Sequence, residues 1–247
     1  IQILLTSFLI SSGILRTDGR IIINENNEKV ILKGFGLGGW LVLEGYMWNF
    51  PGFGSTTTME NAVIDLLGEQ KADLFFERYR SNYITEKDIS FLAENGFNAL
   101  RIPLHYKHFS PSFNEFTDIG FDLLEPIINA CRDNDMYVVL DMHAAPGAQN
   151  TSDFSDSDEQ EARLFTQYSN QKWYVSTWKY IAEHYANEPV VAAYDLLNEP
   201  VLPWGYGPPA LRNLYEWAID SIRMVDPDHI VIIEGNWFGN DHTGLLP

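Results

Sequence analysis

Residues 190–204 read VVAAYDLLNEPVLPW, and this stretch decides the fold that we expect for the rest of the chain. Its first part opens on two valines and is mostly apolar, which is typical of a strand buried on both faces. The apolar run stops at Asn198, Glu199 and Pro200. Because proline disfavours helical geometry at the residue before it, Glu199 is expected at the end of an extended segment. A carboxylate held there suits a general acid better than a packing residue.

Apolar strands and helical segments alternate along the chain on both sides of this stretch. We expect core strands at 34–38, 98–102, 137–142, 191–197 and 230–233. Helical spacing is found at 61–79, 85–95, 121–134, 173–185 and 210–225, and Thr85 with Asp88 gives the second of these a capping-box start. The alternation predicts an α/β protein with a parallel sheet and outer helices, the pattern of a (β/α)8 TIM barrel. Since a closed barrel needs eight strands, the sequence is expected to supply about the first five units.

The length and composition favour one domain. With 247 residues and 45% hydrophobic content, the chain can bury a large core. We therefore interpret 14–247 as the amino-terminal part of a single catalytic domain, in which the runs 20–23 and 29–32 form a hairpin that could floor the barrel. Residues 1–13 are too short for a transmembrane helix of about 20 residues and fit the remnant of a signal peptide, with an apolar strand as the alternative. This predicts a secreted, periplasmic or cell-surface protein with no membrane insertion.

Charge and cysteine content exclude several classes of partner and cofactor. A formal net charge of -18 disfavours nucleic acid and anionic membranes but is compatible with a neutral substrate. The single Cys131 excludes an internal disulfide and argues against a zinc site. No Gly-x-Gly-x-x-Gly motif opens a helix, and no Walker lysine is present. A metal hydrolase built on His143, Glu199, Glu234 and His242 lacks the His-Glu-x-x-His arrangement. We expect no cofactor and no metal.

Two carboxylates, Glu199 and Glu234, stand at expected strand ends, with Arg101, His143 and Asn198 at similar positions. No Gly-x-Ser-x-Gly motif supports a serine nucleophile. Two carboxylates in a cleft rich in Trp and Tyr fit glycoside hydrolysis, in which one protonates the leaving oxygen and the other attacks the anomeric carbon or activates water. Arg101 lies in an otherwise apolar strand and needs a charged partner, which a structural ion pair inside the barrel would also provide.

Four segments resemble glycoside hydrolase family 5: GFGLGGWL at 34–41, GFNALRIP at 96–103, DMHAAPGAQN at 141–150 and LLNEP at 196–200. The first and third are similar to the branch with exo-β-1,3-glucanases and related bacterial β-glucanases. EGNW at 234–237 is similar to cellulase-like members. The resemblance implies a retaining enzyme that acts on a neutral β-linked polysaccharide or oligosaccharide, a β-glucan of the cellulase or β-1,3-glucanase type, as a monomer at full length. β-Mannanase-type specificity, or a non-catalytic carbohydrate-binding protein on a degenerate barrel, are the alternatives.

By the same resemblance, Glu199 is the acid/base, Asn198 hydrogen-bonds the sugar 2-hydroxyl, and Arg101 and His143 support the catalytic carboxylates. The family's nucleophile lies on the seventh strand, so these 247 residues alone are expected to be inactive. Glu234 is one strand after Glu199 rather than three, which favours a substrate-contacting or structural carboxylate over a nucleophile. The residues expected to contact the sugar are Trp40, Glu44, Asn150, Trp204, Glu234 and Trp237.

The Asn198-Glu199 pair presents a geometric difficulty. Strict alternation along a strand directs neighbouring side chains to opposite faces. Both residues reach one site only if the strand ends or bulges there, and Pro200 favours such an irregularity.

Overall fold

The computed structural model describes residues 13–52, 54–157 and 160–245. Its main sheet has five parallel strands in the order β4-β5-β6-β7-β8. These strands are β4 (Gly34–Gly36), β5 (Ala99–His105), β6 (Tyr137–Ala144), β7 (Val191–Asp195) and β8 (Ile230–Ile232). Because sequence order and spatial order agree, each strand lies beside the next through one crossover, as in the first part of a (β/α)8 barrel. The five predicted strands are confirmed, although β4, β7 and β8 are shorter than expected and β5 and β6 are longer.

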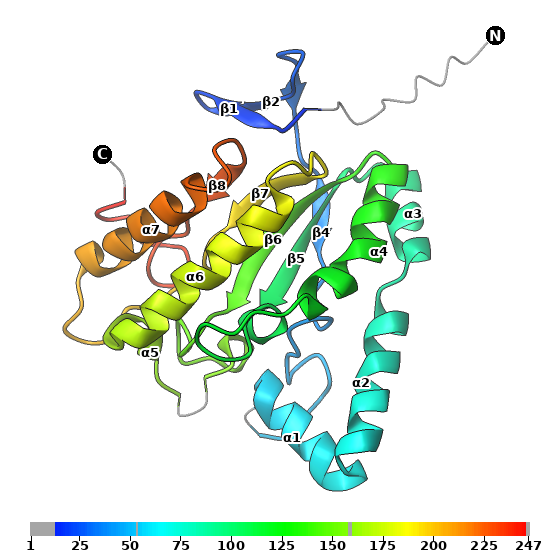
Figure 1. Cartoon of the computed structure of the whole chain (residues 1–247), viewed down its shortest axis with the longest axis vertical. Coiled ribbons are helices and arrows are strands. Elements are labelled where there is room, and N and C mark those ends of the chain that lie inside the picture. Colours follow the sequence, from blue (N-terminus) through cyan, green and yellow to red (C-terminus); the bar gives the residue numbers. More distant parts are fainter. Residues whose placement is uncertain (1–12, 53, 158–159, 246–247) are drawn as a thin grey trace.

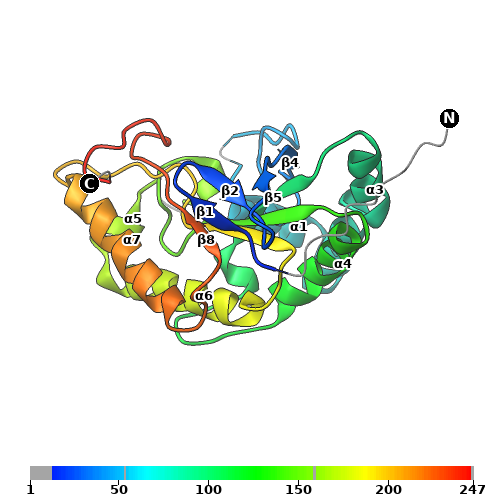
Figure 2. The same cartoon turned by 90° about the horizontal axis from the view of Figure 1, so that it is seen from above.

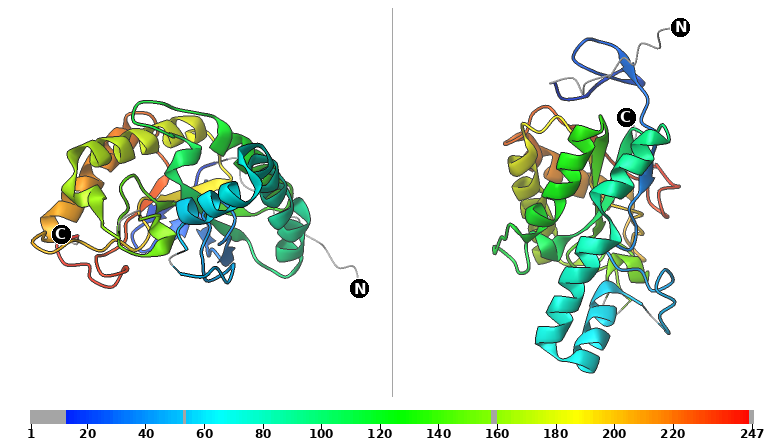
Figure 3. Two further views of the ribbon diagram at one scale, coloured as in Figure 1. Left: turned by 90° about the horizontal axis from the view of Figure 1, so that it is seen from below. Right: turned by 90° about the vertical axis from the view of Figure 1, so that its right-hand side faces the viewer.

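Helices α3, α4, α6 and α7 form an arc over the outer face of this curved sheet, seen from above in Figure 2. Helices α1 and α2 project beyond the carboxyl ends of the strands (Figure 1; Figure 3, right). The helical elements are α1 (Thr56–Leu67), α2 (Glu69–Tyr83), α3 (Glu86–Glu94), α4 (Ile119–Asp133), α5 (Arg163–Thr166), α6 (Tyr168–Tyr185) and α7 (Pro208–Arg223), with short 3-10 turns η1 (Tyr106–His108) and η2 (Asp153–Ser155).

The helix predicted at 61–79 is wrong in its extent. The structure has two helices there, because Gly68 takes a φ of 79° between α1 and α2, a backbone conformation that interrupts a helix. The first of them begins earlier than predicted, where the Ser55 side chain accepts a hydrogen bond from Thr58 N. The capping box at Thr85 is confirmed, since Asp88 Oδ2 accepts from Thr85 N at 2.8 Å.

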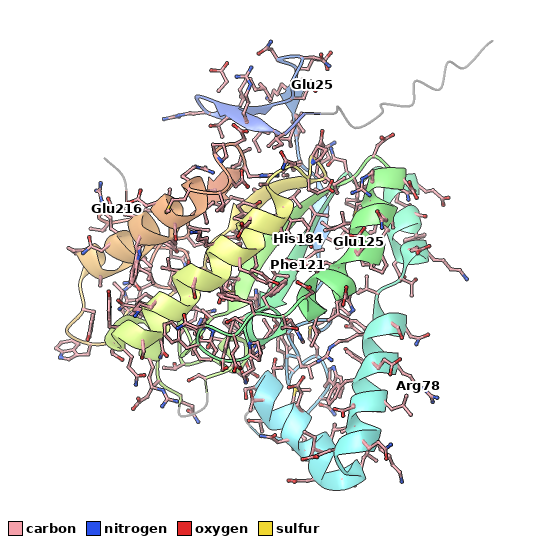
Figure 4. The ribbon with its side chains drawn as sticks, in the orientation of Figure 1. Glu25, Arg78, Phe121, Glu125, His184 and Glu216 are labelled. Carbon is pink, nitrogen blue, oxygen red and sulfur yellow. The ribbon has the colours of Figure 1, made fainter. Side chains whose placement is uncertain are left out.

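The core lies between the sheet and the outer helices. Leu100, Ile102 and Leu104 alternate along β5 and are fully buried against these helices. Helices α4 and α6 meet where Phe121 and His184 stack with ring centroids 3.7 Å apart, and Figure 4 shows the two side chains facing each other. Packing on the outer face leaves the inner face free for polar side chains.

A second, smaller cluster closes the inner face at the amino ends of the strands. The antiparallel strands β1 (Arg16–Asp18), β2 (Ile21–Ile23) and β3 (Lys29–Val30) form a separate sheet at this end (Figure 1). Ile22 and Val30 from this sheet pack with Val139 and Ala193. The predicted hairpin is confirmed, and it covers the floor of the partial barrel. The predicted signal-peptide remnant falls on residues 1–12, outside the described residues, apart from Gly13. Within the described part of the chain, no helix combines the length and apolarity needed to cross a membrane.

Candidate active site

The guanidinium of Arg101 lies at the centre of a group of acidic side chains on the inner face of the sheet. Its Nη1 is 3.0 Å from Asp141 Oδ2, and its Nη2 is 2.8 Å from Asp195 Oδ2. Nε also donates to Asp195 Oδ2, at 3.0 Å. Nη2 further donates to Asn198 Oδ1 at 2.9 Å and to Glu234 Oε1 at 3.1 Å. One cation thus connects side chains that lie on, or shortly after, three neighbouring strands.

Strand register explains how these side chains meet. Asp141 on β6 is paired directly with Asp195 on β7, and Arg101 on β5 is paired with Val139, one pleat earlier. Since alternate residues of a strand point to the same face, Arg101, Asp141 and Asp195 all point inward. Arg101 lies inside β5 rather than at its end, contrary to our expectation. Its long side chain, not its position in the strand, brings the charge to the carboxyl edge.

His143 joins the group from the end of β6. Its Nδ1 is 2.7 Å from Asp141 Oδ2, and its Nε2 is 3.4 Å from Asn198 Nδ2. Burial alone would lower the pKa of His143, but the Asp141 carboxylate beside it outweighs burial and leaves the pKa raised. The predicted residues Arg101, His143, Asn198 and Glu199 are therefore brought together at one edge of the sheet.

The backbone at Glu199 resolves the difficulty of alternation. Strand β7 ends at Asp195, and Glu199 has a φ of 49°. This left-handed conformation costs a residue with a side chain about 1–2 kcal/mol. It breaks the alternation, as Pro200 led us to expect, but it is not the extended geometry that we predicted for Glu199. The strain at Glu199 is offset by hydrogen bonds to both of its peptide groups, because Glu234 Oε2 accepts from Glu199 N at 2.9 Å and Asn150 Nδ2 donates to Glu199 O at 2.8 Å.

Excess negative charge shapes the protonation of the site. Partial burial, followed by the charge of Glu234, raises the pKa of Glu199 against the opposing effect of His143 and Arg101. Burial, followed by the charge of Asp141, raises the pKa of Asp195. A carboxyl group that keeps its proton at higher pH is what a general acid requires. The pKa of Glu199 is therefore displaced in the direction that a general acid needs.

The sugar-contacting residues predicted from the sequence fall into two groups. Trp204 and Trp237 are exposed, at 101% and 58%, on the loops after β7 and β8. Glu44 is buried near His143 and Tyr46, and its charge contributes to raising the pKa of both. These residues can border a ligand at the carboxyl edge.

Trp40 and Asn150 do not fit their predicted roles. The Trp40 ring is 2% exposed in the core behind the sheet, and its Nε1 donates to Arg80 O at 2.9 Å. Asn150 is fully buried; its Nδ2 donates to Glu199 O, and its Oδ1 accepts from Ser152 N. Glu234 accepts hydrogen bonds from Arg101 with one oxygen and from the Glu199 peptide with the other.

Three residues of the site escaped the sequence reasoning: Asp141, Asp195 and Gln149. Asp141 and Asp195 are single acids inside apolar strands, and a buried acid without a neighbour in sequence signals a cationic partner elsewhere. The same physical reason that predicts a charged partner for Arg101 applies to these two acids. The second oxygen, Oδ1, of each aspartate is buried without a hydrogen-bond partner within the described residues. Across the same residues, no three or more His, Cys, Asp or Glu side chains are grouped to hold a metal ion.

Comparison with known proteins places this geometry in a family. Residues 59–246 match Cellulase (glycosyl hydrolase family 5). A beta-xylosidase of Phanerodontia chrysosporium is 32% identical over 231 residues, which cover 93% of this chain and 48% of that protein. A probable glucan 1,3-beta-glucosidase A of Neosartorya fischeri is 32% identical over 207 residues, which cover 82% and 49%.

A solved structure supports the fold. The rutinosidase from Aspergillus niger superposes with a TM-score of 0.71 at 18% identity, over 83% of this chain and 62% of that one. At this identity the likeness concerns the fold alone. The chain spans about half the length of the curated relatives it matches. Since the family match extends over most of the sequence and the sheet carries the expected strand-end residues, this chain belongs to glycoside hydrolase family 5.

Proposed function

We propose that the full-length protein, meaning the natural gene product that contains these 247 residues, is a retaining glycoside hydrolase that cleaves β-glucosidic bonds in a β-glucan. The observation that carries this proposal is the position of Glu199 in the segment that follows β7, beside Glu234 and with a raised pKa. Its relatives named for β-xyloside and β-1,3-glucan substrates support a β-linked substrate.

In this proposal Glu199 protonates the leaving oxygen in the first step and deprotonates water in the second. Asn198 is held beside it by Arg101, with its amide oxygen 2.9 Å from Nη2 and its nitrogen directed toward His143. An amide fixed in this way can hydrogen-bond a sugar hydroxyl without reorganising during the reaction. Arg101 and His143 then act by keeping Asn198 and the surrounding carboxylates in place.

A retaining enzyme needs a nucleophilic carboxylate about 5–5.5 Å from the acid/base. Glu234 is a poor candidate, because one of its oxygens accepts from Arg101 and the other from the Glu199 peptide. Asp141 and Asp195 are buried and share the Arg101 guanidinium. We therefore propose that the nucleophile is supplied by a part of the protein outside these 247 residues.

A neutral glucan fits the surroundings of the site. The chain carries a formal net charge of -18, which disfavours anionic substrates. The exposed rings of Tyr46, Trp204 and Trp237 offer apolar faces against which sugar rings can stack. We propose that the protein acts outside the cytoplasm, as a secreted or cell-surface monomer, where such polysaccharides are found.

The test is turnover by the purified full-length protein on soluble β-1,3-glucan, β-1,4-glucan, β-xylan and β-mannan, each with the Glu199→Gln variant in parallel. The expected result is release of reducing sugar from one of the two glucans and its loss in Glu199→Gln. Preferred cleavage of mannan or xylan would correct the substrate. Binding of a glucan without turnover would favour a non-catalytic carbohydrate-binding protein, and unchanged activity of Glu199→Gln would contradict the assigned acid/base.

A further inference from the structure

The left-handed backbone of Glu199 is enclosed by side chains from two other loops. On its amino side, Glu234 Oε2 accepts the Glu199 N–H at 2.9 Å. On its carboxyl side, Asn150 Nδ2 donates to Glu199 O at 2.8 Å. The preceding carbonyl, Asn198 O, accepts from Gln149 Nε2 at 3.1 Å. Three consecutive polar groups of the backbone are therefore held by side chains rather than by a strand.

The two amides that take part are themselves fixed. Gln149 and Asn150 are both fully buried. Gln149 Nε2 also donates to His143 O at 2.6 Å, and its Oε1 accepts from Ala145 N at 3.2 Å. Asn150 Oδ1 accepts from Ser152 N at 2.9 Å. A buried amide whose nitrogen and oxygen both make hydrogen bonds is held in one orientation, so it can fix the position of the Glu199 backbone.

The third member fixes Glu199 relative to the charged group. Glu234 Oε1 accepts from Arg101 Nη2 at 3.1 Å while its Oε2 holds the Glu199 N–H. The same Nη2 also donates to Asn198 Oδ1. The Arg101 guanidinium therefore holds Asn198 directly and Glu199 through Glu234. The loops after β6 and β8 thus meet at the peptide that carries the Glu199 carboxyl.

We propose that Gln149, Asn150 and Glu234 are positioning residues that hold the strained Glu199 backbone in place, so that the Glu199 carboxyl and the Asn198 amide face the same substrate. This inference rests on the proposed function of Glu199 as acid/base. It assigns to Asn150 and Glu234 a role that acts through Glu199 rather than through the sugar. Loss of one hydrogen bond to the backbone lets Glu199 relax toward an unstrained φ, which moves its carboxyl away from the leaving oxygen.

Asn150→Asp and Gln149→Glu test this inference in the full-length protein, because each keeps the shape of the side chain and removes the amide donors. Asn98→Asp is the matched control. Asn98 Nδ2 donates to Ile31 O at 2.9 Å and its Oδ1 accepts from Lys33 N at 2.7 Å, so it makes the same pair of backbone contacts at the opposite end of the sheet. Glu199→Gln is measured beside them.

Each variant is assayed on the native glucan, whose poor leaving group needs the acid, and for the first step on a dinitrophenyl β-glycoside, whose leaving group does not. We expect Asn150→Asp and Gln149→Glu to lower kcat on the glucan at least about tenfold, with less than about threefold change in the first step on the activated substrate. Asn98→Asp should leave the ratio of the two rates unchanged, even if its thermal midpoint falls.

Equal losses on both substrates, or failure of both site variants to fold while Asn98→Asp folds, would overturn the positioning role in favour of a purely structural one. An unchanged rate on the glucan would overturn it as well. The two proposals fail separately: if Glu199→Gln does not discriminate between the substrates, the proposed function itself is wrong. If Glu199→Gln discriminates and the other two variants do not, only the positioning inference is wrong.

Discussion

Asp141 and Asp195 are paired across neighbouring parallel strands, and their Oδ2 atoms share the guanidinium of Arg101 at 3.0 and 2.8 Å. Two carboxylates in adjacent register positions repel each other unless a cation lies between them or one keeps its proton. Both effects operate here, since Arg101 bridges the pair and the pKa of Asp195 is raised by burial and by Asp141. The buried pair makes the site dependent on Arg101 for its stability as well as its geometry.

Replacing Arg101 by Met should therefore destabilise the protein and abolish glucan hydrolysis. Removing one partner of a buried ion pair costs about 3–5 kcal/mol, and we expect about 3 kcal/mol because the Arg101 side chain is 32% exposed. Urea denaturation of the full-length protein checks the value. The loss should be smaller at pH 4 than at pH 7, since protonation removes the charges that Arg101 compensates; an equal loss at both pH values would contradict this explanation.

Asp156 should contribute stability that, like the contribution of Arg101, falls as the pH falls. Its carboxylate is 2.9 Å from His105 Nε2 and 3.0 Å from Lys107 Nζ, and it accepts from Thr57 N at 2.7 Å. Burial opposes the charge of Asp156, but His105, Lys107 and Thr57 together hold its pKa below the ordinary range. A lowered pKa in the folded state gives stability that is present above the unfolded pKa and is lost as the pH falls toward the folded value.

Asp156→Asn should then cost about 2–3 kcal/mol at pH 7 and somewhat less at pH 3, because the carboxylate of the unfolded protein begins to take up protons there while the folded one stays ionised. The exposed Asp133→Asn on α4 serves as the control and should change the stability little at either pH. Because Phe154, two residues earlier, packs against His143 with ring centroids 5.6 Å apart, the variant should also lower activity. A cost that stays constant between pH 3 and pH 7 would show that the charge of Asp156 is not responsible.

The sequence predicts the parts of this molecule that depend on short-range patterns. Apolar runs predict the five strands, and Thr85 with Asp88 predicts the start of α3. Both predictions depend only on residues that are close in sequence. The family segments also identify Arg101, His143, Asn198 and Glu199, which the structure brings together. What these patterns cannot give is the reach of a long side chain, as for Arg101, which lies well inside its strand.

Residues whose role depends on distant partners were misjudged for a physical reason. Trp and Asn are residue types that often contact sugars, which is why Trp40 and Asn150 were predicted to do so. In the structure Trp40 packs in the core behind the sheet, and the Asn150 side chain donates a hydrogen bond to Glu199 O. Burial decides between a binding and a supporting role, and burial is set by contacts far apart in sequence. Gly68 is a local exception, since a glycine inside a helical pattern is a recognisable breaking point.

Glu234→Gln should shift the basic limb of the kcat/KM profile to lower pH. The charge of Glu234 contributes to the raised pKa of Glu199, so its removal lowers that pKa and deprotonates the acid earlier. Glu216→Gln, an exposed acid on α7, is the control and should leave the limb in place. An unmoved limb would contradict the assigned coupling. Glu234 would instead be identified as the nucleophile if Glu234→Ala hydrolysed neither the native nor the activated substrate and azide restored turnover with a glycosyl azide of inverted configuration as the product.

The 247 residues expressed alone should bind β-glucan oligosaccharides weakly but release no reducing sugar, because one carboxylate of the pair is proposed to lie outside them. The outer strands β4 and β8 of the described sheet pair with a neighbour on one side only, so this polypeptide should also self-associate. Reducing-sugar assays and sedimentation check the two expectations. Turnover equal to that of the full-length protein would show that the nucleophile is within these residues.

The most direct measurement of the central claim is azide rescue of Glu199→Ala in the full-length protein with a dinitrophenyl β-glucoside. Without its base, a retaining enzyme accumulates the glycosyl intermediate, and azide can attack that intermediate without proton transfer. We predict that azide accelerates turnover and that the product is the β-glucosyl azide, with retained configuration. An α-glucosyl azide, or turnover of the native glucan by Glu199→Ala at the wild-type rate, would contradict the assignment of Glu199 as the acid/base.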